Sequence, residues 1–133
     1  MTVPFPAAMP LLSALGLISL AAGALSGWLV LAATEQGAWL RAHGVPAPAR
    51  FRQAHLDWVM MGLILIAVQT VAPGMPDWIR ACIAFGTVVN PLLFLPLAWG
   101  AGAKSNPVYI GITIVSFLSL SIGLPALAVW AIA

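Results

Sequence analysis

The charged residues of this sequence are so few and so placed that four long stretches carry no charge. Only 6% of the 133 residues are charged, and residues 1–34, 58–76, 81–103 and 105–133 are free of Asp, Glu, Lys and Arg. A helix needs roughly 20 apolar residues to cross about 30 Å of hydrocarbon, and helices satisfy their own backbone polar groups in lipid. The sequence therefore predicts an all-α integral membrane protein, a four-transmembrane-helix bundle.

Prolines and charges set the expected boundaries of these helices. We predict a single domain over residues 1–133, with helices at about 10–34, 50–72, 78–100 and 108–132. Pro46 and Pro48 keep the first loop out of regular helix, and Pro91 and Pro96 interrupt the third helix. The first stretch lacks a basic start and is longer than a signal-peptide core, so we expect a retained helix.

The basic residues indicate orientation in the membrane. Those of the first and third loops are Arg41, Arg50, Arg52 and Lys104, whereas Arg80 stands alone at the second loop. The positive-inside rule then places both termini outside the cytoplasm. The net charge of +2 comes from few residues and predicts no nucleic-acid partner. We expect a multi-pass protein of the bacterial inner membrane, surrounded by lipid.

Helical spacing gathers candidate functional side chains on common faces. One face of the second helix combines His55, Trp58, Val59, Gly62, Ile66 and Gln69. Asp57 and Met61 lie on a different flank, because two residues amount to about 200° of rotation. On the third helix, one face combines Thr87, Asn90 and Phe94.

His55 is the candidate ligand for a haem or a transition metal, since neutral imidazole supplies a nitrogen lone pair. Gly62, two turns further along the helix, lacks a side chain and would leave room for something flat. The alternative is an interfacial histidine that faces lipid headgroups. His43 lies in a loop, where we expect it to be exposed to solvent.

Three other features have a structural and a functional interpretation. The Asn90 amide, in an apolar helix, must find a partner, either on a neighbouring helix or in a site. Asp57 is expected to pair at the surface with an arginine: Arg50, Arg52 or Arg80. The small residues of the first helix form a ladder that allows close packing, within one protomer or between subunits: Ser19, Gly23 and Gly27.

Two segments, QAHLDWVMMGLILIAV (53–68) and FGTVVNPLLFLPLAWGAG (85–102), resemble the small four-helix membrane enzymes typified by hydroxylaminobenzene mutase and styrene oxide isomerase. The similarity covers roughly residues 50–131. It implies that His55 ligates the iron of haem b, which acts as a Lewis acid on the substrate oxygen. It also implies that Asn90 belongs to the active site, and that the protein is a homotrimer with haem near the boundary between protomers.

Two positions depart from the family pattern. Met61 stands where the family has an asparagine before the glycine of the second helix, and Phe94 stands where it has a tyrosine. Both changes remove hydrogen-bond donors from the implied pocket. They put the substrate in doubt more than the haem, because the ligating histidine is kept.

The leading hypothesis is therefore a haem b isomerase or mutase for a small apolar or aromatic substrate of the epoxide or hydroxylamine type. In it, His55 binds the iron beside Gly62, Asn90 orients the substrate, and Trp58 and Phe94 form apolar walls.

Two alternatives remain. One is a non-catalytic haem-binding or electron-transfer subunit, which would need a second axial ligand such as His43, Met60 or a residue of a partner. The other is a structural membrane subunit without a cofactor. The sequence contains none of the usual motifs for hydrolysis or for thiol redox chemistry.

Overall fold

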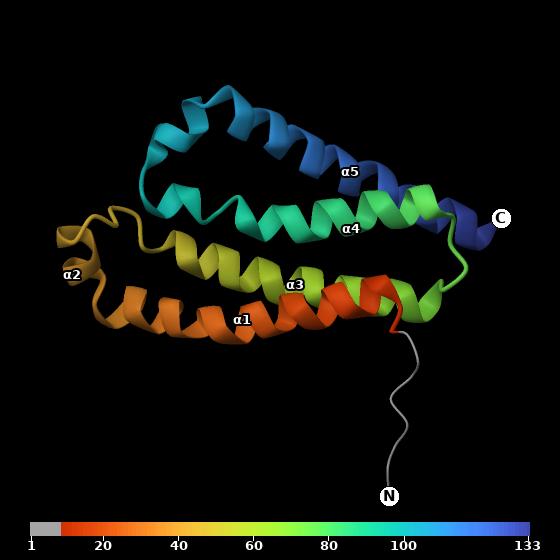
Figure 1. Cartoon of the computed structure of the whole chain (residues 1–133), viewed down its shortest axis with the longest axis horizontal. Helices are drawn as coiled ribbons and strands as arrows, with labels where there is room; N and C mark the ends of the chain where they lie inside the picture. Colours follow the sequence, from red (N-terminus) through yellow and green to blue (C-terminus); the bar gives the residue numbers. More distant parts are fainter. Residues whose placement is uncertain (1–8) are drawn as a thin grey trace, which may run out of the picture.

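The computed structural model describes residues 9–133, and within this range four helices are long and apolar enough to span a membrane. They are α1 (Leu11–Glu35), α3 (Arg50–Val71), α4 (Asp77–Leu92), whose membrane span continues to Ala98, and α5 (Pro107–Ile132). A short helix, α2 (Gly37–Ala42), follows α1 (Figure 1). Two 3-10 turns, η1 (Pro96–Ala98) and η2 (Ala101–Ser105), connect α4 to α5. The predicted all-α class is confirmed, and the protein is a multi-pass membrane protein.

The long helices pack as a row in the order α1, α3, α4, α5 (Figure 1). The contact between α1 and α3 is the most extensive, and α5 packs mainly on α4. In Figure 1, α5 diverges from α4 toward its N-terminal end. The largest buried cluster lies near the turn between α3 and α4: Leu12, Leu65, Ala72, Met75, Ile79 and Ile83.

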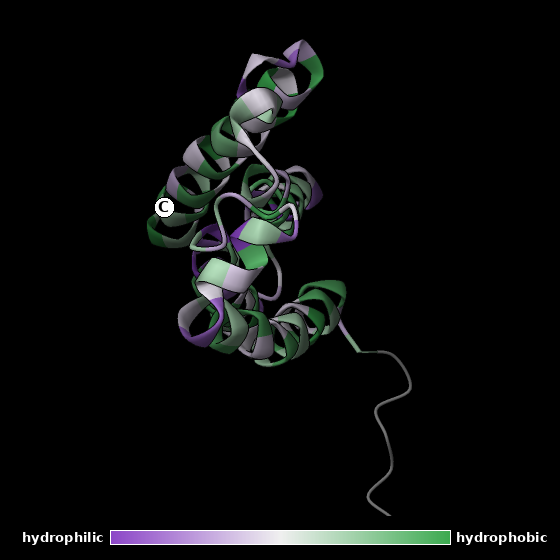
Figure 2. Cartoon of the chain, turned by 90° about the vertical axis from the view of Figure 1, so that its left-hand side faces the viewer, coloured by the Kyte–Doolittle hydropathy of each residue, from purple (hydrophilic) through white to green (hydrophobic). Residues whose placement is uncertain are grey.

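The outer surface of the row is apolar. Large hydrophobic side chains on every long helix are exposed, among them Leu25, Val71 and Ile132. Figure 2 shows hydrophobic colouring over much of the helices. An apolar exterior of this kind is stable only against lipid or another apolar surface, which agrees with four membrane spans.

Helix α4 ends at Leu92, earlier than the predicted end at residue 100. The next residues bond three positions back instead of four: Phe94 N–H donates to the Pro91 carbonyl at 3.3 Å, and Leu95 N–H donates to the Leu92 carbonyl at 3.2 Å. Pro96, which has no N–H and whose ring would clash with the Leu92 carbonyl in an α-helix, prevents the α-helical pattern from continuing. The chain turns there, and the Tyr109 hydroxyl of α5 donates to the Leu93 carbonyl oxygen at 2.7 Å. The other predicted boundaries agree with the structure to within one residue.

Candidate functional site

The ring of His55, in the second turn of α3, is held by α1. Its Nδ1 atom lies 2.8 Å from the Gly23 carbonyl oxygen and 3.2 Å from Ser26 Oγ. A carbonyl oxygen only accepts hydrogen bonds, so the bond to Gly23 requires a proton on Nδ1. The neutral ring then has its lone pair on Nε2. Metal-binding histidines are commonly oriented in this way, with the second nitrogen donating to a carbonyl.

Small residues on α1 let α3 approach closely enough for this bond. A Cβ atom built on Gly23 would lie 2.7 Å from Val59 Cγ2, and one built on Gly27 would lie 3.7 Å from His55 Cε1. Ser26 Oγ also donates to the Gly23 carbonyl at 2.8 Å. For Gly23 and Gly27, the interpretation of the ladder as packing within one protomer is therefore confirmed.

Gly62 lies where the backbones of α1 and α3 meet. A Cβ atom there would be 2.9 Å from the Gly16 carbonyl oxygen and 2.9 Å from Leu20 Cγ. The space that the sequence suggested for a flat group beside Gly62 is thus occupied by α1. A cofactor bound to His55 would have to lie elsewhere around the ring.

An apolar groove lies beside Ser26, on the outer surface of the α1 and α3 pair. It has a volume of about 300 Å³, and its lining consists of Ala22, Leu25, Ser26, Leu29 and Trp58. Leu25 is 72% exposed, so the groove opens toward lipid or toward a neighbouring chain. Ser26 connects the groove to His55, because its hydroxyl contacts Nδ1 of that ring. Trp58 is the part of the groove that α3 supplies.

The opposite flank of α3 carries a polar pair with α4. Asn90 Nδ2 donates to Asp57 Oδ2 at 2.9 Å. Asn90 is only 7% exposed, and its Oδ1 atom is buried without a hydrogen-bond partner in the described part of the chain. The expectation that the Asn90 amide finds a partner on a neighbouring helix is confirmed.

The predicted surface ion pair of Asp57 with an arginine is wrong. Arg50 donates to Gln53, and Arg80 pairs with Asp77 at 2.6 Å in the one ion pair among residues 9–133. Asp57 instead faces α4 and is partly buried. The sequence predicted that Asp57 and His55 lie on different flanks of the helix. It did not predict which helix packs against the flank of Asp57.

The predicted common face of the third helix extends only to Asn90. Thr87 is fully buried, and its hydroxyl donates to the Ile83 carbonyl at 2.6 Å. Phe94 lies beyond the end of α4, in the turn before η1, and is partly buried. The side chain of Met61 is partly buried as well.

His43 is exposed at the end of α2, as predicted. Its ring stacks on Trp39 with 4.0 Å between centroids, and its Nδ1 lies 2.8 Å from the Trp39 carbonyl oxygen. It therefore resembles His55 in hydrogen bonding but lies outside the long helices.

His55 points from α3 toward α1, whereas Asn90 belongs to α4 and contacts the other flank of α3. Within one chain, the two residues therefore do not form a single site. No group of three or more His, Cys, Asp or Glu side chains that could hold a metal ion exists in the range 9–133. No protein-family model, no curated protein and no solved structure matches the chain.

Proposed function

We propose that this protein binds haem b through His55 and acts as a membrane isomerase or mutase on a small apolar or aromatic epoxide or hydroxylamine. The observation that carries the proposal is the 2.8 Å contact between His55 Nδ1 and the Gly23 carbonyl oxygen, which leaves Nε2 for iron. The resemblance of residues 53–68 and 85–102 to haem-dependent isomerases supplies the reaction type.

In this proposal, one chain encloses the haem only in part. His55 Nε2 would bind the iron, and Trp58, Leu25 and Leu29 would contact the apolar macrocycle. When bound, haem supplies a Lewis acid that polarises a C–O or N–O bond. The groove of about 300 Å³ is at the lower end of the roughly 300–1,000 Å³ that enclose a drug-sized ligand. The proposal therefore includes a homotrimer in which a neighbouring copy completes the pocket.

The chain's own residues have separate tasks in this proposal. The Gly23 carbonyl and Ser26 hold the His55 ring in one tautomer, and Gly62 allows the α1 contact that brings this carbonyl into reach. The apolar groove admits a substrate from the bilayer and excludes water. Asn90 orients the substrate beside Phe94, which requires α4 of one copy to face the groove of another.

An absorption spectrum of the purified protein, produced with ample haem, tests the cofactor. We expect a Soret band of five-coordinate haem in the parent and in His43→Ala, and its loss in His55→Ala with the protein still folded. His43 is a matched control because its Nδ1 also bonds to a backbone carbonyl. A full Soret band in His55→Ala would contradict the proposal.

Other spectra would favour the alternatives. A six-coordinate, low-spin spectrum would favour an electron-transfer subunit, and a parent without a Soret band would favour a structural role. The reaction itself is tested by incubating the loaded parent with a panel of aryl epoxides and aryl hydroxylamines. If the haem-loaded protein isomerises none of them, the proposed reaction is contradicted, whereas the proposed haem binding is not.

The assembly is tested separately by native mass spectrometry from detergent. We expect a trimer as the dominant species. Because α3 already covers Gly23 and Gly27, the trimer would have to use other surfaces, such as the exposed faces of α1 and α5. A dominant monomer would exclude a pocket completed by a neighbouring copy.

A further inference from the structure

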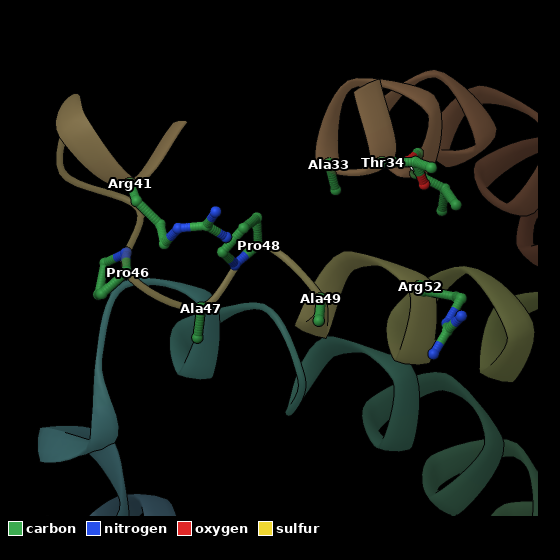
Figure 3. A pocket seen from close by; sticks show the side chains of 9 residues that line it. Ala33, Thr34, Arg41, Pro46, Ala47, Pro48, Ala49 and Arg52 are labelled. Carbon is green, nitrogen blue, oxygen red and sulfur yellow. Dashed lines mark hydrogen bonds between the residues drawn. The ribbon is translucent and has the colours of Figure 1, made fainter. Parts of the chain in front are cut away.

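A second pocket lies at the end of the helix row that carries the first loop (Figure 3). Its volume is about 310 Å³, and it lies between the last turns of α1 and the first turn of α3. Two arginines from different elements line it, Arg41 of α2 and Arg52 of α3. Much of the remaining wall is apolar, formed by Val30, Ala33 and Pro48 among others. The pocket thus combines a cationic rim with an apolar wall.

The positive charge of this pocket is not neutralised within residues 9–133. Neither Arg41 nor Arg52 takes part in an ion pair there, and no carboxylate lines the pocket. Glu35, next to the lining residue Thr34, is exposed and forms no ion pair in the same range. At the other end of the row, by contrast, Arg80 is paired with Asp77. An anion would therefore be attracted specifically to the end with the first loop.

The donor groups of the pocket suit a phosphate. A guanidinium presents several N–H donors in a planar fork that matches phosphate oxygens, and its charge strengthens each hydrogen bond. The Thr34 hydroxyl already donates to the Val30 carbonyl at 2.9 Å, so the two arginines are the principal free donors. Helix α3 also begins at this pocket, and its positive end favours an anion.

The position of the pocket indicates the source of that phosphate. It lies where two membrane-spanning helices end, which is the depth of lipid headgroups. The apolar wall of Val30 and Ala33 belongs to the last turns of α1 and would cover the glycerol and first methylenes of a lipid. A free phosphate ion would gain nothing from that wall.

We propose that this pocket binds the phosphate group of an anionic phospholipid, with Arg41 and Arg52, which lie on opposite sides of the pocket (Figure 3), as the donors that turn toward it. The lipid joins α2 and α3, two segments that are otherwise connected here through the loop of residues 43–49. The proposal does not depend on haem or on any reaction at His55. It agrees with the predicted cytoplasmic location of the first loop, since basic pockets between helices on that side commonly bind anionic lipid.

Native mass spectrometry of the full chain, titrated with phosphatidylglycerol in detergent, tests the proposal. We expect Arg41→Gln/Arg52→Gln to weaken lipid binding at least about tenfold, since each charge-assisted hydrogen bond lost accounts for about that factor. The matched control is Arg50→Gln/Lys104→Gln, which removes two charges from the same end but none from the pocket lining. We expect it to retain binding to within about threefold, as charges outside the pocket act only through the surface field.

Equal weakening in both double variants would mean general surface attraction and would overturn the site. Undiminished binding in the pocket variant would overturn it as well. Phosphatidylcholine and inorganic phosphate serve as competitors, and displacement of the lipid by millimolar phosphate would overturn the lipid assignment. Should the Gln variant not fold, Arg41→Lys/Arg52→Lys provides the test. It keeps the charge but loses the fork, so unchanged affinity in this variant would contradict bidentate recognition.

Discussion

Along α3, the flank toward α1 is held by close backbone packing, whereas the flank toward α4 is joined by a polar pair. On the α1 side, Gly16 and Gly62 bring the two helices so near that an added Cβ at either position would meet a backbone oxygen at 2.9 Å. On the α4 side, the contact includes the hydrogen bond of Asn90 to Asp57. His55 and Asp57 are two positions apart in the sequence, yet each belongs to a different contact.

The two flanks differ in how many hydrogen-bonding atoms of their polar side chains are already bonded within the chain. His55 is bound to a backbone carbonyl through one nitrogen and keeps the other available. Asp57 and Asn90 satisfy each other in part, and the remaining Asn90 oxygen is buried. His55 Nε2 therefore has no hydrogen bond to lose in the described part of the chain, whereas a ligand at Asn90 would compete with Asp57.

The largest effect is expected where the backbones of α1 and α3 meet. Gly62→Ala would place a methyl group against the Gly16 carbonyl oxygen, and overpacking of this kind costs about 1–3 kcal/mol. Thermal unfolding in detergent measures it. Gly111→Ala in α5 is the control, because an added Cβ there meets nothing within 4 Å. Equal melting temperatures for the two variants would mean that α1 and α3 are not in close contact.

An intermediate effect is expected on the α4 side. A double-mutant cycle with Asp57→Ala and Asn90→Leu should give a coupling free energy of about 0.6 kcal/mol and no more than about 1.7, as for other hydrogen bonds between membrane helices. If Asn90 also orients a substrate, Asn90→Leu should reduce turnover about a hundredfold, since misplacement by about 1 Å can have that effect. A coupling free energy of zero would contradict the hydrogen bond between Asp57 and Asn90. Unchanged turnover would mean that Asn90 has only a packing role.

The smallest effect is expected from Ser26→Ala. Removing the only outer partner of a metal-binding histidine costs roughly tenfold to hundredfold in affinity, but the Gly23 carbonyl remains in this variant. We therefore expect less than about tenfold weaker haem binding, measured by titration of the haem-free protein. A complete loss of haem would show that Ser26, and not Gly23, orients the ring.

The helices were predictable because the positions of eight charges and a few prolines nearly determine where a chain can cross lipid. The end of α4 at Leu92 was predictable too, since the ring of Pro96 would clash with the Leu92 carbonyl in a continued α-helix. The sequence prediction noted that Pro96 interrupts the helix but still extended it to residue 100, because hydropathy alone continues through Trp99.

The contacts between helices were less predictable. His55 and Asp57 could be assigned to different flanks from the helical period, but the partner of each depends on how α1 and α4 are rotated about their own axes. That rotation arises from many small packing contacts, such as Gly16 with Gly62, and no local motif encodes it. For the same reason the pocket of Arg41 and Arg52 was not foreseen, since its residues come from three separate segments.

Because α4 ends early, the third membrane span is only partly α-helical. At about 1.5 Å per residue, the 25 residues of α1 and the 26 of α5 extend over about 37 and 39 Å, whereas the 16 of α4 extend over only about 24 Å. The hydrocarbon core measures about 30 Å, so α1 and α5 must tilt, whereas the third span crosses it only because the chain continues through the turns to Ala98. We therefore expect the stability of the protein to vary with lipid chain length and to be greatest at an intermediate thickness.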